Sequence, residues 1–159
     1  PKSRALPVAS LLAYPSEGTG MSPSSARSGE TILVVDDHAE MLAFTAEALE
    51  AQGYTVLSTV DANEALNLAR TRFEPIHVLL TDIVMPAMNG RELSERVRAV
   101  RAETKVLFMS AYTAEASHDH QVCINPGEPF LVKPFTLAEL ASKVRKVLDY
   151  RSAFAQRRA

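Results

Sequence analysis

The amino-acid sequence predicts a parallel α/β sheet with helices on both faces, and three observations lead to this fold class. Five strand-like runs alternate along the chain with amphipathic helical stretches, which is the pattern of α/β proteins. Runs such as LVV, VLL and VLF are continuously apolar, as expected of strands that are buried on both faces. Right-handed crossovers between such strands leave few topologies.

The elements follow one another in a regular order from Thr31. The expected strands cover residues 31–35, 54–58, 76–81, 104–110 and 129–132. The expected helices cover residues 38–52, 61–73, 89–101, 113–121 and 136–150. Five such units predict a flavodoxin-like, doubly wound (βα)5 sheet with the strand order 2-1-3-4-5.

Capping signals mark the ends of several helices. Three helix starts carry a capping residue followed three positions later by Glu: Asp61/Glu64, Asn89/Glu92 and Thr136/Glu139. Gly53 supplies the stop of the first helix. The last helix has the clearest apolar stripe, made of Leu137, Leu140, Ala141, Val144 and Val147.

Composition limits the classes of function. The chain has 159 residues, the size of about one domain, and its net charge of −2 with interspersed signs indicates no nucleic-acid or membrane surface. The single cysteine, Cys123, excludes an internal disulfide and fits a reducing compartment. We therefore expect a cytoplasmic domain without direct nucleic-acid binding or membrane contact of its own.

The chain divides into three parts. Residues 1–29 are rich in Pro, Ser and Gly and are expected to be a linker or disordered lead-in. The folded domain is expected over residues 30–150. Residues 151–159 are expected to form a C-terminal tail that frays from the last helix.

Polar residues interrupt the apolar pattern where the strands end. Asp36 and Asp37 end the first strand, Asp82 the third, Ser110 the fourth and Lys133 the fifth. The carboxyl ends of parallel strands share one edge, and a ligand crevice lies where the strand order reverses. We therefore expect three carboxylates, a hydroxyl and an ammonium to converge there.

This set of groups points to phosphoryl chemistry. Three close carboxylates repel one another, and a divalent cation resolves the conflict. Oxygen ligands with open positions suit Mg²⁺. A carboxylate beside Mg²⁺ and a lysine is equipped to accept a phosphoryl group, with Asp82 supplying the nucleophilic oxygen.

Each residue also has a purely structural interpretation. Asp37 could be the N-cap of the first helix, with Glu40 three residues on. Lys133 could be one arm of an ion pair with any of the three acids, and Ser110 could be a turn hydroxyl. Their joint placement at four strand ends favours a functional site.

The motifs at these positions resemble the response-regulator receiver domain. They are ILVVDD (32–37), LLTDIVMPAMNG (79–90), FMSAYT (108–113) and FLVKPFT (130–136). The resemblance covers about Thr31 to Tyr150 and implies a phosphoacceptor of two-component phosphorelay signalling rather than a turnover enzyme. Asp82 would accept a phosphoryl group from a phosphohistidine on a histidine kinase or phosphotransfer protein.

The resemblance also implies the site's ligands. Asp37 and Asp82 would bind Mg²⁺ together with the backbone carbonyl of Val84, and Asp36 would act largely through water. Lys133 would contact the phosphoryl group, and the Lys133–Pro134 bond would be cis.

The implied switch uses Ser110 and Phe130. Ser110 would donate its hydroxyl to a phosphoryl oxygen, and Phe130 would swing inward when Ser110 moves. Phe130 stands where many receivers have Tyr, so any hydroxyl-mediated step is lost. Partner binding, and a weak homodimer, would use the face formed by residues 113–121, 129–132 and 136–150. The weakly apolar 113–121 stretch is expected to be short or mobile.

Two histidine signals are weaker. His118, His120 and Cys123 form H-x-H-x-x-C, which suggests zinc, but a solvated loop is favoured because a further ligand is missing nearby. His38 could tune the site edge, although a surface position on the first helical turn is favoured.

Other function classes remain as alternatives. A haloacid-dehalogenase-like phosphatase also uses a strand-end Asp, but its second Asp would stand where this chain has Val84. A flavodoxin-like cofactor binder needs a phosphate-cradling loop where this chain has Asp36-Asp37-His38. Among receivers, the final LASKVRKVLDY and the early RALPVAS favour a receiver of a hybrid sensor histidine kinase over a free-standing regulator. A membrane sensor could then tether the domain, and the kinase part would be an enzyme.

Overall fold

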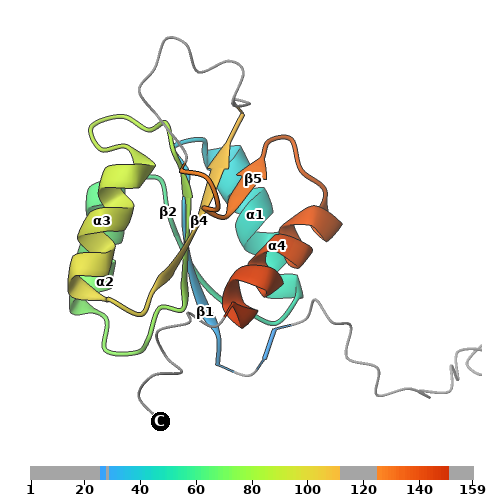
Figure 1. The fold of residues 1–159 in the computed structure, drawn as a ribbon, viewed down its shortest axis with the longest axis horizontal. Helices are drawn as coiled ribbons and strands as arrows, with labels where there is room; N and C mark the ends of the chain where they lie inside the picture. The colour runs from blue at the N-terminus through green and yellow to red at the C-terminus, as the bar shows by residue number, and fades with distance from the viewer. Residues whose placement is uncertain (1–25, 28, 112–124, 151–159) are drawn as a thin grey trace, which may run out of the picture.

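The computed structural model describes residues 26–27, 29–111 and 125–150. Within them, five strands form one parallel sheet in the order β2-β1-β3-β4-β5, which confirms the predicted topology (Figure 1). The strands are β1 (Thr31–Val35), β2 (Thr55–Thr59), β3 (Val78–Asp82), β4 (Lys105–Ser110) and β5 (Phe130–Val132).

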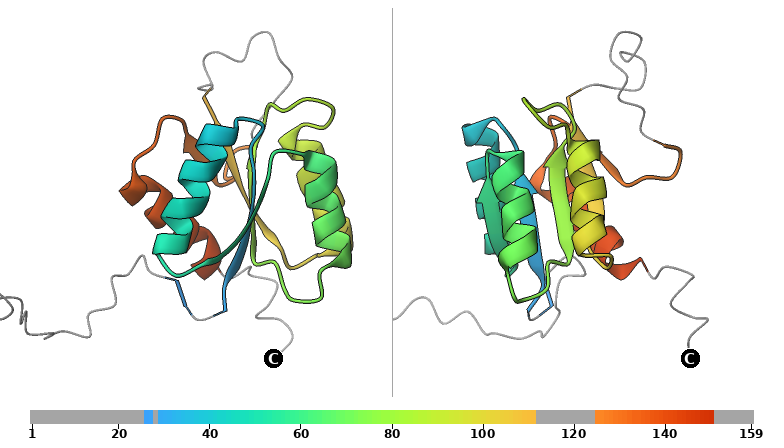
Figure 2. Two further views of the ribbon diagram at one scale, coloured as in Figure 1. Left: turned by 180° about the vertical axis from the view of Figure 1, so that it is seen from behind. Right: turned by 90° about the vertical axis from the view of Figure 1, so that its left-hand side faces the viewer.

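Helices cover both faces of this sheet. In the described residues they are α1 (Ala39–Ala51), α2 (Ala62–Thr71), α3 (Gly90–Val100) and α4 (Leu137–Asp149). Figures 1 and 2 show α1 and α4 on one face and α2 and α3 on the other. The helix expected at 113–121 lies outside the described residues. None of the described helices is both long enough and apolar enough to span a membrane.

Two apolar layers result from the alternation of side chains along the central strands. Ile32 and Val34 of β1 pack on the side of α1 and α4, whereas Leu33 and Val35 pack on the side of α2 and α3, because successive strand residues point to opposite faces. Every residue of β1 and β3 is buried. The continuous apolar runs therefore mark the central strands, as expected.

The helix caps follow the sequence signals with one difference. Thr136 and Glu139 form the full capping box. The Asp61 and Asn89 side chains also cap their helices. The glutamates three residues later do not complete a capping box, because Glu64 bonds to Thr59 and Glu92 bonds to Arg96. Gly53 follows α1 with a φ of 94°, as a left-handed helix stop.

Three details differ from the expectations. The third strand runs from Val78 to Asp82, later at both ends than the expected residues 76–81. Leu137 is 54% exposed, so the apolar stripe of α4 that packs on the sheet begins at Leu140. Ala26, in the expected lead-in, packs against the core and donates its N–H to Gln52 O at 3.0 Å. The domain boundary at residue 30 remains a prediction.

Candidate functional site

The topology brings three of the predicted polar residues, Asp36, Asp82 and Lys133, into contact at the carboxyl edge of the sheet. Lys133 follows β5 and reaches across β4 to the central strands. Its Nζ lies 2.6 Å from Asp36 Oδ2 and 2.9 Å from Asp82 Oδ2. Asp36 is fully buried and Asp82 is 6% exposed. Asp36 and Asp82 thus share one ammonium, although 97 and 51 residues separate them from it in the sequence.

The backbone around Asp82 is held from several sides. Ile83 N–H donates to Met109 O of β4 at 3.0 Å, and Gly90 N–H donates to Ile83 O at 2.8 Å. A Cβ at Gly90 would stand 2.1 Å from the carbonyl oxygen of Asp82, a separation that steric repulsion forbids. Glycine is therefore required for α3 to begin this close to the strand end.

The Asp82 side chain is oriented by two donors. Val84 N–H donates to Oδ1 at 3.2 Å, while Lys133 Nζ donates to Oδ2. Burial by itself would lower the pKa of Lys133, but the hydrogen bonds and charges of Asp36 and Asp82 outweigh it and raise that pKa above its usual value. The lysine is therefore held as a cation between the two carboxylates.

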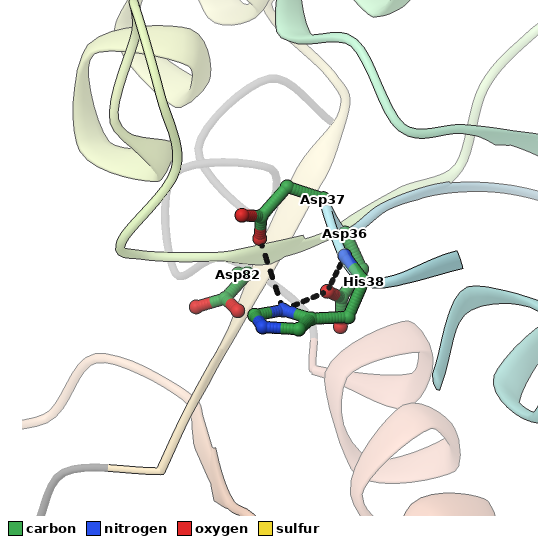
Figure 3. Close-up of side chains that lie close together, drawn as sticks. All are labelled: Asp36, Asp37, His38 and Asp82. Atoms are coloured by element: carbon green, nitrogen blue, oxygen red, sulfur yellow. Dashed lines mark hydrogen bonds and ion pairs between the residues drawn. The ribbon is translucent and has the colours of Figure 1, made fainter. Parts of the chain in front are cut away.

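Asp37 lies on the same edge but does not cap a helix. The N-cap of α1 is His38, and no side chain caps this helix start, so the N-cap interpretation of Asp37 is wrong. Asp37 Oδ1 is shielded from solvent and accepts no hydrogen bond from the described residues. His38 Nδ1 lies 3.2 Å from this oxygen, close enough for an ion pair, but the two groups form no hydrogen bond (Figure 3). The Asp37 carboxylate therefore lies beside the acidic pair Asp36 and Asp82 and does not cap the helix.

These residues fit a divalent cation. One ligand atom from each of Asp36, Asp37, His38 and Asp82 lies within 4.8 Å of the others. Three carboxylates face one ammonium, so the cluster carries excess negative charge as well as an unsatisfied buried oxygen. Oxygen-rich sets of this kind suit Mg²⁺. The side chain of His38 is 72% exposed, as expected, yet its ring contacts Asp36 and Asp37. The only hint of this contact in the sequence is that His38 directly follows the two acids.

Ser110 and Phe130 lie at the ends of the neighbouring strands. Ser110 is the buried last residue of β4, and its carbonyl accepts a hydrogen bond from Lys133 N–H at 2.9 Å. Phe130 begins β5, pairs in register with Phe108, and packs half-buried on the α2–α3 side. The Lys133–Pro134 bond is cis, as expected. His118, His120 and Cys123 lie outside the described residues.

An ion pair near Phe130 was not expected from the sequence. Arg91, in the first turn of α3, binds Glu128 with Nη2 2.6 Å from Oε2. Its guanidinium also lies 5.4 Å from the centre of the Phe108 ring. The pair joins α3 to the loop before β5 across 37 residues, and no local pattern signals such a contact.

Comparison with known proteins places this architecture in a family. The model of the response regulator receiver domain matches residues 32–145. This chain belongs to the response regulator receiver domain family. It is therefore a receiver domain of two-component signalling, and the resemblance found in the sequence is confirmed.

Individual relatives support the assignment. The chain is 36% identical over 123 residues to the response regulator receiver protein CpdR of Brucella abortus, covering 74% of this chain and 95% of CpdR. It is 31% identical over 119 residues to the sensor kinase CckA of the same organism, covering 75% of this chain but 12% of CckA. The solved receiver domain of a hybrid histidine kinase CckA superposes with a TM-score of 0.63 at 31% identity, covering 75% of this chain and 99% of that domain.

Proposed function

We propose that Asp82 of this receiver domain accepts a phosphoryl group from a phosphohistidine on a histidine kinase or phosphotransfer protein. The main observation in support of this proposal is that the buried Asp82 carboxylate, at the end of a central strand, shares the ammonium of Lys133 with Asp36. A carboxylate oxygen attacks phosphorus while the phosphorus–nitrogen bond of the donor breaks, and the electron pair of that bond leaves with the imidazole. Lys133 Nζ would stabilise the negative charge of the transferred group, and its contact with Asp82 supports this role.

The metal belongs to the same proposal. Asp36, Asp37 and Asp82, with the backbone carbonyl of Val84, would hold Mg²⁺, which neutralises charge on the phosphoryl oxygens. The unsatisfied Asp37 Oδ1 supports this assignment. A haloacid-dehalogenase-like phosphatase is not supported, because Val84 stands where that chemistry needs a second Asp, and the family match is to receivers.

Phosphorylation would then act as a switch. Ser110 would hydrogen-bond to the phosphoryl group, and Phe130 would move inward with it, biasing a two-state equilibrium. The face that responds would comprise residues 113–121, β5 and α4, which would bind a partner or a second copy weakly. The half-buried position of Phe130 at the start of edge strand β5 supports this role.

We further propose that the domain, spanning residues 30–150, belongs to a cytoplasmic part of a hybrid histidine kinase. The similarity to the CckA receiver supports this origin. The complete gene tests it: a histidine-kinase core upstream of residue 26 supports the hybrid origin, and a short reading frame that begins at Met21 contradicts it.

Phosphorylation is tested with acetyl phosphate and Mg²⁺. The expected product is a labile adduct carrying one phosphoryl group, detected by intact-protein mass spectrometry. Asp82→Asn should abolish it, and chelation of Mg²⁺ should do the same. Asp61→Asn is the matched control, since Asn caps α2 as well as Asp does and lies outside the site. Equal labelling of Asp82→Asn and the unchanged chain would refute the proposal.

A further inference from the structure

His38 is exposed, yet its ring is placed at the acidic cluster. Nδ1 lies 3.3 Å from Asp36 Oδ1 and 3.2 Å from Asp37 Oδ1 (Figure 3). The backbone N–H of His38 donates to the same Asp36 oxygen at 2.9 Å. This bond fixes the residue against a fully buried carboxylate, so the side chain starts from a defined position beside the site.

The spacing of these atoms matches one coordination sphere. Ligands about 2.1 Å from an octahedral metal stand roughly 3 Å apart when adjacent. Nδ1 lies 3.3 and 3.2 Å from the two carboxylate oxygens, close to this separation, and the set that includes Asp82 lies within 4.8 Å. Asp37 Oδ1, buried and without a hydrogen bond from the described residues, is an oxygen that a cation would satisfy.

An imidazole changes which cations such a site prefers. Mg²⁺ favours oxygen ligands and retains its waters. Divalent first-row transition metals gain more from an imidazole nitrogen, in the order Mn²⁺ < Co²⁺ < Ni²⁺. A site with three carboxylates and one imidazole is therefore suited to these ions as well as to Mg²⁺.

We propose that His38 is a metal ligand of this receiver domain and a determinant of its metal preference. Its Nδ1 would join the carboxylates in holding the ion and would raise the affinity for transition-metal ions. The proposal rests on the metal site of the proposed function. It adds a residue-specific selectivity that an oxygen-only set would not have.

Two measurements test the role of His38. Pulsed electron paramagnetic resonance of the Mn²⁺-loaded chain is expected to show nitrogen coupling, which His38→Ala should remove. Calorimetry with Co²⁺ and with Mg²⁺ separates selectivity from general damage: His38→Ala should weaken Co²⁺ about tenfold, whereas the affinity for Mg²⁺ should change less than about twofold.

Other nitrogen and sulfur ligands are controlled by substitution. The variant H118A/H120A/C123S removes the two imidazoles and the thiol of the H-x-H-x-x-C stretch, and it should keep the nitrogen coupling and the Co²⁺ affinity. The remaining histidine, His77, accepts the N–H of Thr31 at the opposite end of strand β1. Coupling that persists in His38→Ala, or that disappears in the triple variant, overturns the proposal.

The outcome also separates this inference from the proposed function. Asp37→Asn should weaken the binding of both metals. Mg²⁺ binding that depends on Asp37, without nitrogen coupling in the Mn²⁺ state, overturns the role of His38 alone. Metal binding that is insensitive to Asp37→Asn overturns the proposed metal site and this inference together.

Discussion

Each end of strand β1 carries a cluster of charged side chains, and the two clusters differ in how their charges are paired. Glu30 precedes the strand and Asp36 follows it. At the Glu30 end, Arg145 of α4 binds both oxygens of Glu30, at 2.8 and 2.9 Å. It also binds both oxygens of Asp149, at 3.1 and 2.9 Å. The single guanidinium of Arg145 makes two bonds to each carboxylate, and Arg27 Nη2 lies 3.3 Å from Asp149 Oδ1, so two cations meet two carboxylates there.

The cluster at the Asp36 end has fewer cationic partners than carboxylates among the described residues. One ammonium, from Lys133, serves Asp36 and Asp82, and the nearby Asp37 retains a buried oxygen without a hydrogen bond from the described residues. In a cluster whose charges are all paired, the ion pairs stabilise the fold. In a cluster with excess negative charge, the carboxylates repel one another, and binding of a cation relieves that repulsion. The difference distinguishes a structural ion-pair network from a candidate site.

The largest expected effect comes from breaking the completed cluster. Arg145→Met leaves the half-buried Glu30 without its guanidinium partner, which should lower the free energy of unfolding by about 3 kcal/mol, the low end for a broken buried pair. Urea denaturation measures this. Arg96→Met, which breaks the exposed pair with Glu92, is the control and should cost about 0.5 kcal/mol or less. Similar losses in the two variants would contradict the distinction.

Adding a cation should complete the other cluster. Mg²⁺ at about one hundred times its dissociation constant should stabilise the chain by roughly 2.7 kcal/mol, because it binds the folded state. Thermal unfolding with and without Mg²⁺ measures the gain. Asp37→Asn should remove most of it, while Asp61→Asn should retain it. A gain of the same size in Asp37→Asn would place the cation elsewhere.

Removing one charge from the incomplete cluster should stabilise the metal-free chain. Asp37→Asn relieves repulsion among three carboxylates, and we expect a gain of about 0.5–2 kcal/mol without divalent ions. Denaturation in the presence of a chelator measures it. A loss of stability would mean that Asp37 serves the fold, in contradiction to the absence of a capping bond at α1.

The smallest effect is expected from pH at the completed cluster. Hydrogen bonds from Arg145, opposed in part by burial, hold the pKa of Glu30 below its usual 4.5. The stability that Glu30 contributes is therefore present above about pH 4.5 and is lost as the pH falls through the lower folded-state pKa. Glu30→Gln should flatten this part of the stability–pH curve, measured as the difference from the unchanged chain. Parallel curves for the two chains would show that Glu30 contributes no such dependence.

Local patterns in the sequence determined most of the fold. The apolar runs predicted the central strands, and the capping residues predicted the starts of α2, α3 and α4 to within a residue. These features depend on neighbours within one or two turns of the chain, so the sequence displays them directly. The polar residues at the strand ends also predicted the site, because parallel strands place their carboxyl ends on one edge.

Tertiary structure alone decided how the charges pair. Lys133 had three acids as candidate partners, and the fold gives it Asp36 and Asp82. The sequence was compatible with Asp37 either capping α1 or facing the site, and in the structure the N-cap is His38. Arg145 meets Glu30 across 115 residues. Such contacts depend on where separate elements come to lie, and electrostatic energies at a few ångströms have no periodic signature in the sequence.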